Sequence, residues 1–395
     1  MKKLRYVLTI FFVLFIYAYI VNISNLQSNI VLLEGEKCCF HVCPFIDVSE
    51  TSSVSSNSEN RYQIELNLFG KINLKTISVT ELKNLEIIPS GEVIGLKLYT
   101  NGVLIVGMSE VEDFENNKVK PYEGSEIKEG DTIIQIDEDE IDSVKTLKSV
   151  VNKSKGKELK LTVVRDGTTL TSNIIPAKVS KSEYKLGLWV RDAATGVGTL
   201  TYYNPDNNQF GALGHGISDS DTGKMIEIDS GELVTSKIIS ITKGVSGTAG
   251  EIRGTILNQP TIGTVVKNTN FGIFGTLNNL ENLKIDYSKK MKVALRNEIQ
   301  EGDASIYCNI DGDEVKEYAI KIEKIYYDNN YDNKSFLIKV TDENLLNKTG
   351  GIIRGLSGSP IIQNNKFVGA VTNVVLAKPE IGYGIFADLM IKNSK

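Results

Sequence analysis

A histidine flanked by glycines is the first candidate for chemistry in this sequence. Residues 210–219 read FGALGHGISD, which places His215 between Gly214 and Gly216. The chain has only 2 histidines, and the other, His41, lies near the N-terminus. Histidine changes charge near neutral pH, and the glycines leave its ring uncrowded. His215 is therefore the candidate general base, with a purely structural histidine as the alternative.

A serine in a glycine-rich turn is the second candidate. Residues 349–362 read TGGIIRGLSGSPII, with Gly355 before and Gly358 after Ser357. A serine nucleophile needs an exposed hydroxyl, and Gly355 allows its own N–H and that of Ser357 to point at one spot as an oxyanion hole. Ser359 is a rival nucleophile. An ordinary turn between two strands is the alternative to a catalytic one.

Most of the cysteines crowd into one short segment. Cys38, Cys39 and Cys43 surround His41, and the fourth cysteine is Cys308. Cysteine and histidine can hold zinc, but such sites use paired ligands with a second half elsewhere in the chain, and no second half exists here. We therefore expect no metal site, and the proposed chemistry needs no cofactor.

Composition limits the function classes. Hydrophobic residues make up 41% of the chain, which is enough to bury cores and excludes disorder throughout. The formal net charge of -5 gives no bulk attraction to phosphate, so we expect no nucleic-acid partner. The length of 395 residues favours two or three domains.

The N-terminus combines a basic start with an apolar run. Residues 1–5 read MKKLR, and the apolar run extends from Tyr6 to Val21. About 17 or more apolar residues are needed to span a bilayer, so the run is close to the minimum. A secretory signal has the same features, but the segment after Asn22 lacks a clear cleavage site. We expect residues 1–24 to be a cytoplasmic start and transmembrane anchor, with everything after them outside the cytoplasm.

A linker and a pair of strands are expected to follow the anchor. We assign residues 25–60 to a juxtamembrane linker, because its last part, residues 50–60, is a polar, low-complexity spacer with nothing to pack. Residues 61–88 form a strand-rich connecting segment. Apolar and polar residues alternate from Arg61 to Thr76 with a break at Phe69–Gly70, which predicts strand, turn and strand.

Short strands around one amphipathic helix are predicted between residues 89 and 179. The pattern resembles an α+β PDZ domain, on the strength of GSEIKEGDTIIQID at residues 124–137, the helix, and VVRDG at residues 163–167. PDZ domains capture chain ends by adding a peptide strand to a sheet edge. The resemblance implies binding of protein C-termini, with the capture loop at Ile94, Gly95 and Leu96. Strands are predicted at residues 94–98 and 102–107, a turn into a further strand at 127–136, the helix at 143–152 and a closing hairpin at 159–167.

Residues 180–395 are rich in strands and turn glycines, which indicates a barrel or sandwich. The order of anchor, PDZ-like region, GHG and GLSGSP resembles the stage IV sporulation protein B serine peptidases, most specifically over the final 50 residues. More distantly, the SGSP turn and the order of histidine before serine resemble chymotrypsin-like peptidases. This resemblance implies a mainly β chain whose C-terminal domain is a chymotrypsin-like double β-barrel with the site between the barrels.

The family resemblance also implies roles for individual residues. Ser357 would be the nucleophile, His215 its base, and Asp342 the carboxylate that orients the histidine. The N–H groups of Gly355 and Ser357 would form the oxyanion hole. In chymotrypsin-like enzymes the acid lies far ahead of the serine, whereas Asp342 is close to it, so three aspartates after His215 remain alternatives: Asp219, Asp221 and Asp229.

The implied activity is that of a membrane-anchored serine endopeptidase in sporulation signalling. Such an enzyme leaves the forespore, enters the space between the two membranes and cleaves itself near its N-terminal stalk. It also cleaves a membrane-bound regulator of an intramembrane protease, which then processes a late sigma factor precursor. The alternative from another class is a non-catalytic, membrane-tethered PDZ adaptor that binds protein C-termini. A general quality-control protease is disfavoured, because those enzymes usually place the PDZ domain after the peptidase.

Overall fold

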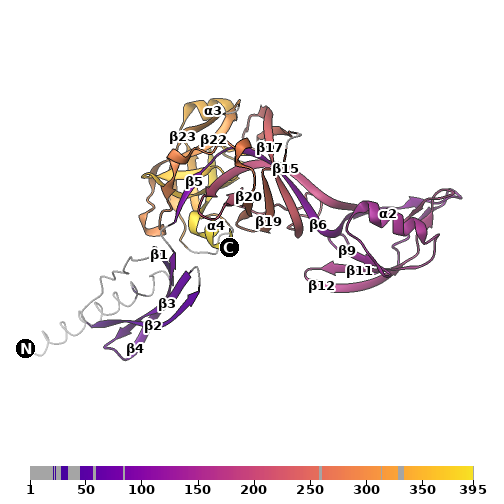
Figure 1. Ribbon diagram of the computed structural model, residues 1–395, viewed down its shortest axis with the longest axis horizontal. Helices are drawn as coiled ribbons and strands as arrows, with labels where there is room; N and C mark the ends of the chain where they lie inside the picture. The colour runs from indigo at the N-terminus through magenta and orange to yellow at the C-terminus, as the bar shows by residue number, and fades with distance from the viewer. Residues whose placement is uncertain are drawn as a thin grey trace, which may run out of the picture. The chain divides into compact units, whose positions relative to one another are not determined.

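The computed structural model describes residues 21, 23, 28–33, 45–56, 59–82, 85–257, 260–312, 314–327 and 333–394. It divides into two compact units, the first made of residues 1–86 and 292–300 and the second of residues 87–291 and 301–395 (Figure 1). Apart from Val21 and Ile23, the expected anchor lies outside the described residues, as does the cysteine and histidine cluster at 38–43. Across the described ranges, no helix has the length and apolar character needed to cross a membrane.

The first unit contains a sheet with the strand order β1-β4-β3-β2. Alternating apolar residues on β3 and β4 bury one face, because successive side chains of a strand point to opposite sides. The predicted turn at Phe69–Gly70 is confirmed, and both residues have positive φ. The bounds are β1 Asn29–Leu33, β2 Ile46–Ser56, β3 Glu59–Leu68 and β4 Ile72–Leu82.

The prediction of an unpaired spacer at residues 50–60 is wrong for the part that the structure describes. Residues 50–56 belong to β2, which pairs antiparallel with β3, including Thr51 with Gln63 and Val54 with Arg61. The polar composition suggested a chain with nothing to bury. Strand formation here depends instead on backbone hydrogen bonds to a neighbouring strand, which β-branched residues such as Thr51 and Val54 favour.

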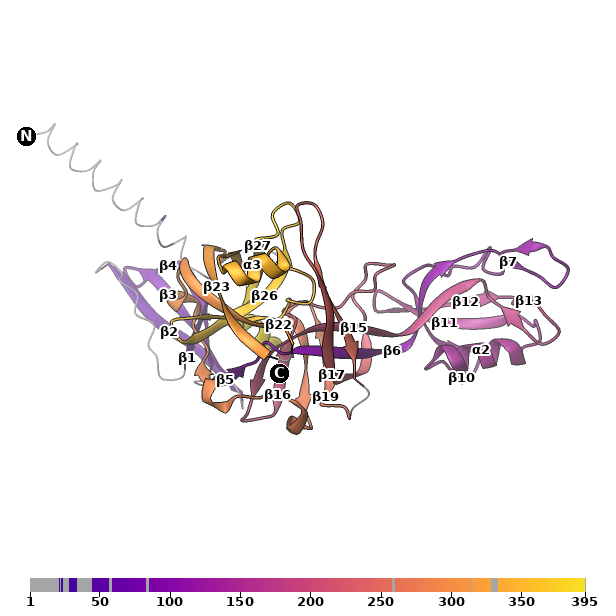
Figure 2. The same cartoon turned by 90° about the horizontal axis from the view of Figure 1, so that it is seen from above.

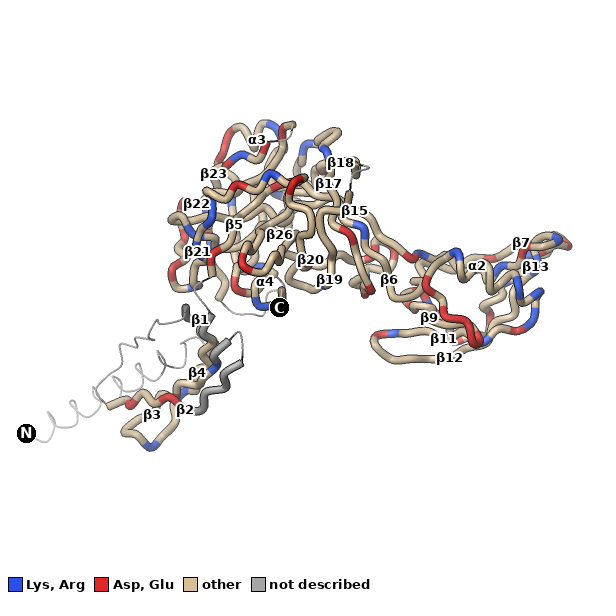
Figure 3. The backbone as a smooth tube through the Cα atoms, viewed as in Figure 1, with Lys and Arg blue, Asp and Glu red and all other residues tan. Residues whose placement is uncertain are grey.

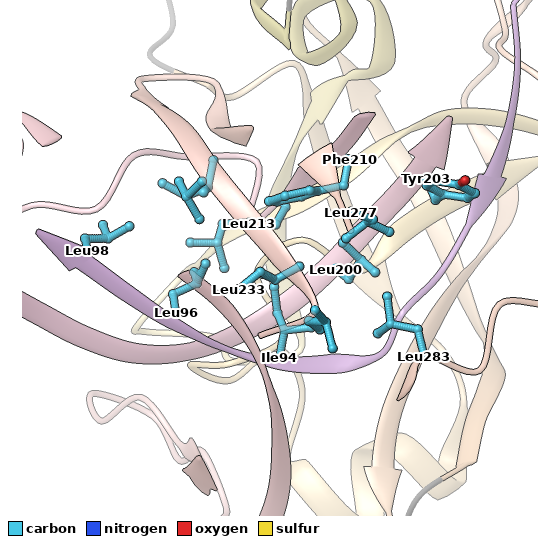
Figure 4. Packing of buried hydrophobic residues seen from close by; sticks show 14 of the residues in the cluster. Ile94, Leu96, Leu98, Leu200, Tyr203, Phe210, Leu213, Leu233, Leu277 and Leu283 are labelled. Carbon is cyan, nitrogen blue, oxygen red and sulfur yellow. The ribbon is translucent and has the colours of Figure 1, made fainter. Parts of the chain in front are cut away.

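The second unit holds two closed β-barrels. The first barrel closes because its first strand, β6, pairs with both β17 and β15, and its interior is filled by apolar side chains (Figure 4). Within the described residues its six strands, in barrel order, are β6 Val93–Met108, β17 Ile228–Thr242, β19 Gly263–Thr269, β20 Gly272–Leu277, β16 Gln209–Ala212 and β15 Leu188–Asn204. β5 Glu86–Pro89 pairs with β15, and β18 Glu251–Ile256 pairs with β17.

The second barrel is built from the C-terminal part of the chain. Its strands follow the order β22-β23-β24-β27-β26-β25, and two short helices accompany them. The expectation of a mainly β chain with two barrels is therefore confirmed. The bounds are β22 Gly302–Asp311, β23 Glu314–Ile325, β24 Phe336–Val340, α3 Glu343–Thr349, β25 Pro360–Gln363, β26 Lys366–Val374, β27 Ile381–Phe386 and α4 Ala387–Ser394. The short β21, Met291–Lys292, is not part of this barrel and lies next to β5 in the sheet of the first barrel.

The PDZ-like region packs one helix against a small sheet. The helix α2 begins after Ser143, whose side chain accepts a hydrogen bond from the Thr146 N–H as an N-cap, and it buries Leu147, Val150 and Val151. The predicted helix and closing hairpin are confirmed. The bounds are β7 Val111–Glu112, β8 Lys118–Val119, β9 Thr132–Ile136, β10 Asp139–Glu140, α2 Val144–Lys153, β11 Leu159–Arg165, β12 Thr168–Ile174, β13 Ala177–Lys178 and β14 Tyr184–Lys185.

Two long strands are shared by the PDZ-like region and the first barrel. The first half of β6 pairs within the barrel, and its last part, Val103–Met108, lies in the PDZ-like sheet. β15 accompanies β6 along both parts (Figure 2). The structure thus divides the chain differently from the expected boundaries at residues 89 and 180, because one continuous strand serves both folds.

The predicted capture loop is wrong for the same reason. Ile94, Gly95 and Leu96 lie in the barrel half of β6, with β15 on one edge and β17 on the other. Ile94 is 0% and Leu96 1% exposed, and both point into the barrel core (Figure 4). A strand that is paired on both edges has no free N–H groups to offer to a peptide.

Candidate active site

His215 lies in the loop that follows β16 of the first barrel. Leu213 and Gly214 before it have φ values of +68° and +70°, so the chain turns sharply at the end of the strand. A Cβ on Gly214 would lie 3.1 Å from Thr372 Cγ2 in β26. The loop that carries His215 therefore packs directly against a strand of the second barrel.

The hydrogen bond of His215 defines its tautomer. Nδ1 lies 2.8 Å from the carbonyl oxygen of Gly216, and a carbonyl can only accept, so Nδ1 carries the proton of the neutral ring. Nε2 is then the basic nitrogen. Burial disfavours the charged ring and lowers the pKa of His215 below its ordinary value of 6.5, while the bond to Gly216 acts in the opposite sense. The imidazole is thus neutral at pH 7, as a general base must be.

Ser357 lies in the turn between α3 and β25. Gly355 and Gly358 around it have φ values of +99° and +96°, which favour glycine. A Cβ on Gly358 would lie only 2.3 Å from the Thr199 carbonyl oxygen, so no other residue fits there. Ser359 is 0% exposed, and its hydroxyl has no hydrogen-bond partner, so this rival is closed off from substrate.

The two loops meet at β15 and β26. The Thr199 N–H donates to the Ser357 carbonyl oxygen at 3.2 Å, and the Leu213 N–H donates to the Thr199 carbonyl oxygen at the same distance. On the other side, the Ser357 hydroxyl donates to the Thr372 carbonyl oxygen at 2.6 Å, next to the place where Gly214 packs. The structure therefore brings the segments of His215 and Ser357 together, although the two side chains do not hydrogen-bond to each other.

The N–H groups predicted for the oxyanion hole are available. The neighbouring amides are engaged, because the Leu356 N–H donates to Ile353 and the Gly358 N–H to Val371. Those of Gly355 and Ser357 have no hydrogen-bond partner among the described residues. Two free donors beside a serine hydroxyl can stabilise negative charge on a carbonyl oxygen.

Asp342 is not brought to His215. It is the N-cap of α3, and its carboxylate accepts the Leu345 N–H at 3.0 Å. Burial raises the pKa of the Cys308 thiol, and the nearby Asp342 charge adds to the effect, which places Asp342 beside β22 of the second barrel. The whole of β24, about 17 Å long at 3.3 Å per residue, separates Asp342 from Asn333, which lines the same cavity as His215.

The alternative aspartates do not hydrogen-bond to His215 either, and two of them are engaged with Arg191. Asp219 forms an ion pair with Arg191 and accepts the N–H groups of Asp221 and Thr222. Burial opposes its ionisation, but these hydrogen bonds and the Arg191 charge outweigh it and lower the pKa of Asp219. Asp221 also pairs with Arg191 at 2.8 Å, and Asp229 is exposed. In the described part of the chain, no carboxylate hydrogen-bonds to His215.

Asn268 in β19 is a residue that sequence reasoning missed. Its side-chain oxygen accepts the Ile217 N–H, and its NH₂ group donates to the Ile217 and Ile226 carbonyl oxygens, all at 2.8 or 2.9 Å. This amide holds both ends of the loop that follows His215. No local pattern in the sequence distinguishes Asn268 from other strand asparagines.

An open cavity of about 490 Å³ lies beside His215. Its lining is polar and contains one formal charge, Lys334, whose Nζ lies 5.2 Å from the centre of the Tyr383 ring. Basic and acidic residues are otherwise interspersed along the described chain (Figure 3). The cavity is lined by His215, Gly216, Ser218, Met225, Asn270, Asn333, Lys334, Asn373, Val374 and Tyr383, and Ser357 is not among these residues.

No group of three metal-ligating side chains occurs within the described ranges. A hydroxyl, a neutral imidazole and free N–H donors are the parts of a serine peptidase site. A family model described as SpoIVB peptidase S55 matches residues 182–391, which is more than half of the chain. The chain belongs to the SpoIVB peptidase S55 family. It is therefore a serine peptidase, and the segments that carry His215 and Ser357 both lie inside the matched region.

Further comparisons concern the PDZ-like region and the solved structures of other proteins. A PDZ domain model matches residues 94–175, which confirms that assignment. The chain is similar to the crystal structure of the active form of the Rv3671c protease from M. tuberculosis, at a TM-score of 0.31 and 12% identity, over 51% of this chain and 73% of that chain. For the inactive form of the same protease, the TM-score is 0.28 and the identity 13%, over 50% of this chain and 82% of that chain. The search of curated proteins found no match.

Proposed function

We propose that Ser357 is the nucleophile of this S55-family peptidase and His215 its general base. The single observation that carries this proposal is the meeting of their two loops at Thr199 and Thr372, although the residues are far apart in sequence. The neutral imidazole with a basic Nε2 and the free N–H groups of the serine turn support it.

The reaction begins with a change of hydrogen-bond partner. The Ser357 hydroxyl leaves the Thr372 carbonyl oxygen and donates to His215 Nε2, a rotation compatible with the loose catalytic hydrogen bonds of substrate-free enzymes. Ser357 Oγ then attacks the peptide carbonyl carbon while Nε2 takes its proton. The N–H groups of Gly355 and Ser357 stabilise the resulting oxyanion, and the imidazolium returns the proton to the leaving amine.

We infer that a main-chain carbonyl orients the histidine. The Gly216 carbonyl oxygen accepts the Nδ1 proton and so keeps the basic lone pair on Nε2, which is the tautomer role that an aspartate has in the triad. The family resemblance gives this role to Asp342. The N-cap hydrogen bond of Asp342 favours the carbonyl instead.

We further propose that the enzyme is a membrane-anchored endopeptidase that acts outside the cytoplasm in sporulation signalling. Its substrates would be its own N-terminal stalk and a membrane-bound regulator of an intramembrane protease that processes a late sigma factor precursor. Membership of the family and the apolar run from Tyr6 to Val21 support this role. The PDZ domain would contribute binding of protein or peptide partners.

A fluorophosphonate probe on the full-length chain tests the catalytic proposal, because it reacts with activated serines. We expect labelling of the parent protein and of Ser359→Ala, and none of Ser357→Ala or His215→Ala. Mass spectrometry of the self-cleavage fragments, with Ser357→Ala as the control, then maps the scissile bond. Equal labelling of all four proteins, or none in folded protein, would favour the non-catalytic PDZ adaptor.

A further inference from the structure

The peptide edge of the PDZ domain is already occupied by the chain itself. PDZ domains bind an extended peptide as an added strand on an exposed sheet edge. The part of β6 that lies in the PDZ sheet is Val103–Met108, and on one side Ile105 exchanges hydrogen bonds with Gly130 and Asp131. On its other side it pairs antiparallel with Leu188–Arg191, from Leu188 opposite Met108 to Arg191 opposite Leu104. Both sides of this strand are therefore filled.

The segment Tyr184–Arg191, here named the groove segment, makes the contacts of a bound peptide. Alternate side chains pack on the hydrophobic core of the PDZ domain, with Leu186 only 5% exposed and Tyr184, Leu188 and Val190 partly buried. Trp189, between two of them, faces outward and is 64% exposed. This alternation is what an added strand gives when one of its faces covers a core.

Polar contacts tie the groove segment at both walls of the groove. On the helix side, the Tyr184 N–H donates to the Asn152 side-chain oxygen at 2.8 Å. On the strand side, the Ser109 N–H donates to the Gly187 carbonyl oxygen and the Trp189 Nε1–H donates to the Ser109 hydroxyl, both at 2.9 Å. A hollow of about 510 Å³ remains beside the groove segment, lined on its helix side by Leu147 and Val151 of α2.

We propose that the groove segment is an internal ligand of the PDZ domain, and that a partner peptide binds this edge only by displacing it. The inference rests on peptide binding by the PDZ domain, which is part of the proposed function, and is independent of peptidase activity. The apparent affinity for a partner is then the intrinsic affinity reduced by the small fraction of molecules with an open edge. Weakening the groove segment should accordingly tighten partner binding.

Gly187 is the position at which the groove segment can be weakened selectively. Its φ is +74°, and a Cβ would lie 2.8 Å from the Ser109 carbonyl oxygen, so Gly187→Ala strains the backbone and pushes the segment off β6. Gly167→Ala is the matched control. Its φ is +77°, it lies in the same domain, and no atom is within 4 Å of its Cβ position.

The probe is a fluorescent synthetic peptide with the sequence Tyr184–Val190 and a free C-terminal carboxylate. Its fluorescence anisotropy is measured with full-length protein in a Ser357→Ala background, so that no hydrolysis interferes. We expect Gly187→Ala to bind the peptide at least about 10-fold more tightly than either the parent or Gly167→Ala. Equal affinity in the three proteins, or no binding by folded Gly187→Ala, would overturn the proposal.

A second measurement needs no glycine substitution. Trp189 is the only tryptophan of the chain, so its emission reports on the groove segment alone. Excess of the same peptide with phenylalanine in place of Trp189 should shift that emission, because the indole of the displaced groove segment loses its hydrogen bond to the Ser109 hydroxyl. Peptide binding that leaves the Trp189 emission unchanged would mean that the peptide occupies another edge, and the internal ligand would be refuted.

Discussion

Substitution of Asp342 separates a structural role from a catalytic one. The structure uses this carboxylate to accept the Leu345 N–H at the start of α3. Asparagine caps a helix as well as aspartate does, whereas alanine costs about 1 kcal/mol. For a domain of about 200 residues, that cost lowers the melting temperature by about 2–4 °C. We therefore expect Asp342→Ala to melt a few degrees lower, and Asp342→Asn to melt with the parent.

The same pair of variants is informative about rate. Because His215 Nδ1 donates to the Gly216 carbonyl oxygen, we expect Asp342→Asn to react with a fluorophosphonate probe within about threefold of the parent rate. An aspartate that sets the histidine tautomer would instead cost about 10⁴-fold when changed to asparagine. The assay is the second-order labelling rate at pH 7.5 on protein with a verified melting curve. A loss of that size in folded Asp342→Asn would show that the carboxylate reaches His215 in the reacting enzyme, against our reasoning.

Three further results are expected. Since burial lowers the pKa of His215, the labelling rate should fall on acidification with a midpoint below 6.5, and a midpoint above 6.5 would contradict the buried, neutral ring. Gly358→Ala places a Cβ 2.3 Å from the Thr199 carbonyl oxygen and should slow labelling at least about 100-fold, whereas Gly247→Ala, with φ +85° and open space, should not. Asn268→Ala should cost about 1–3 kcal/mol in chemical denaturation by leaving backbone groups of the His215 loop unpaired; unchanged stability would refute that anchoring role.

Local sequence patterns predicted the elements well where the relevant forces are local. Alternation of apolar and polar residues predicted the strands β3 and β4, and the spacing of apolar residues predicted the helix α2. The glycines around His215 and Ser357 marked turns whose positive φ values the structure contains. These features depend on the conformational preferences of neighbouring residues, which the sequence displays directly.

Local sequence patterns did not predict contacts between segments that are far apart in the chain. The Thr199 hydroxyl donates to the Gly355 carbonyl oxygen, 156 positions away in the sequence. The residues next to Thr199 and Gly355 contain no pattern that predicts this contact. The roles of Asp342 and of the loop at Ile94–Leu96 were taken from a family resemblance. The structure departs from both expectations. Asp342 caps the start of α3, and Ile94–Leu96 pairs with β17 in addition to β15.

Because β6 and β15 run continuously through the barrel and the PDZ domain, the PDZ domain cannot be cut out of the chain without damage to the barrel. The segment matched by the PDZ model starts at residue 94, so excising it would remove the stretch of β6 that holds β15 and β17 together. The remaining chain would be an opened barrel and not a truncated enzyme. Because the PDZ domain and the first barrel share β6 and β15, the PDZ domain cannot be exchanged as an independent unit. A domain exchange between relatives must transfer both strands together.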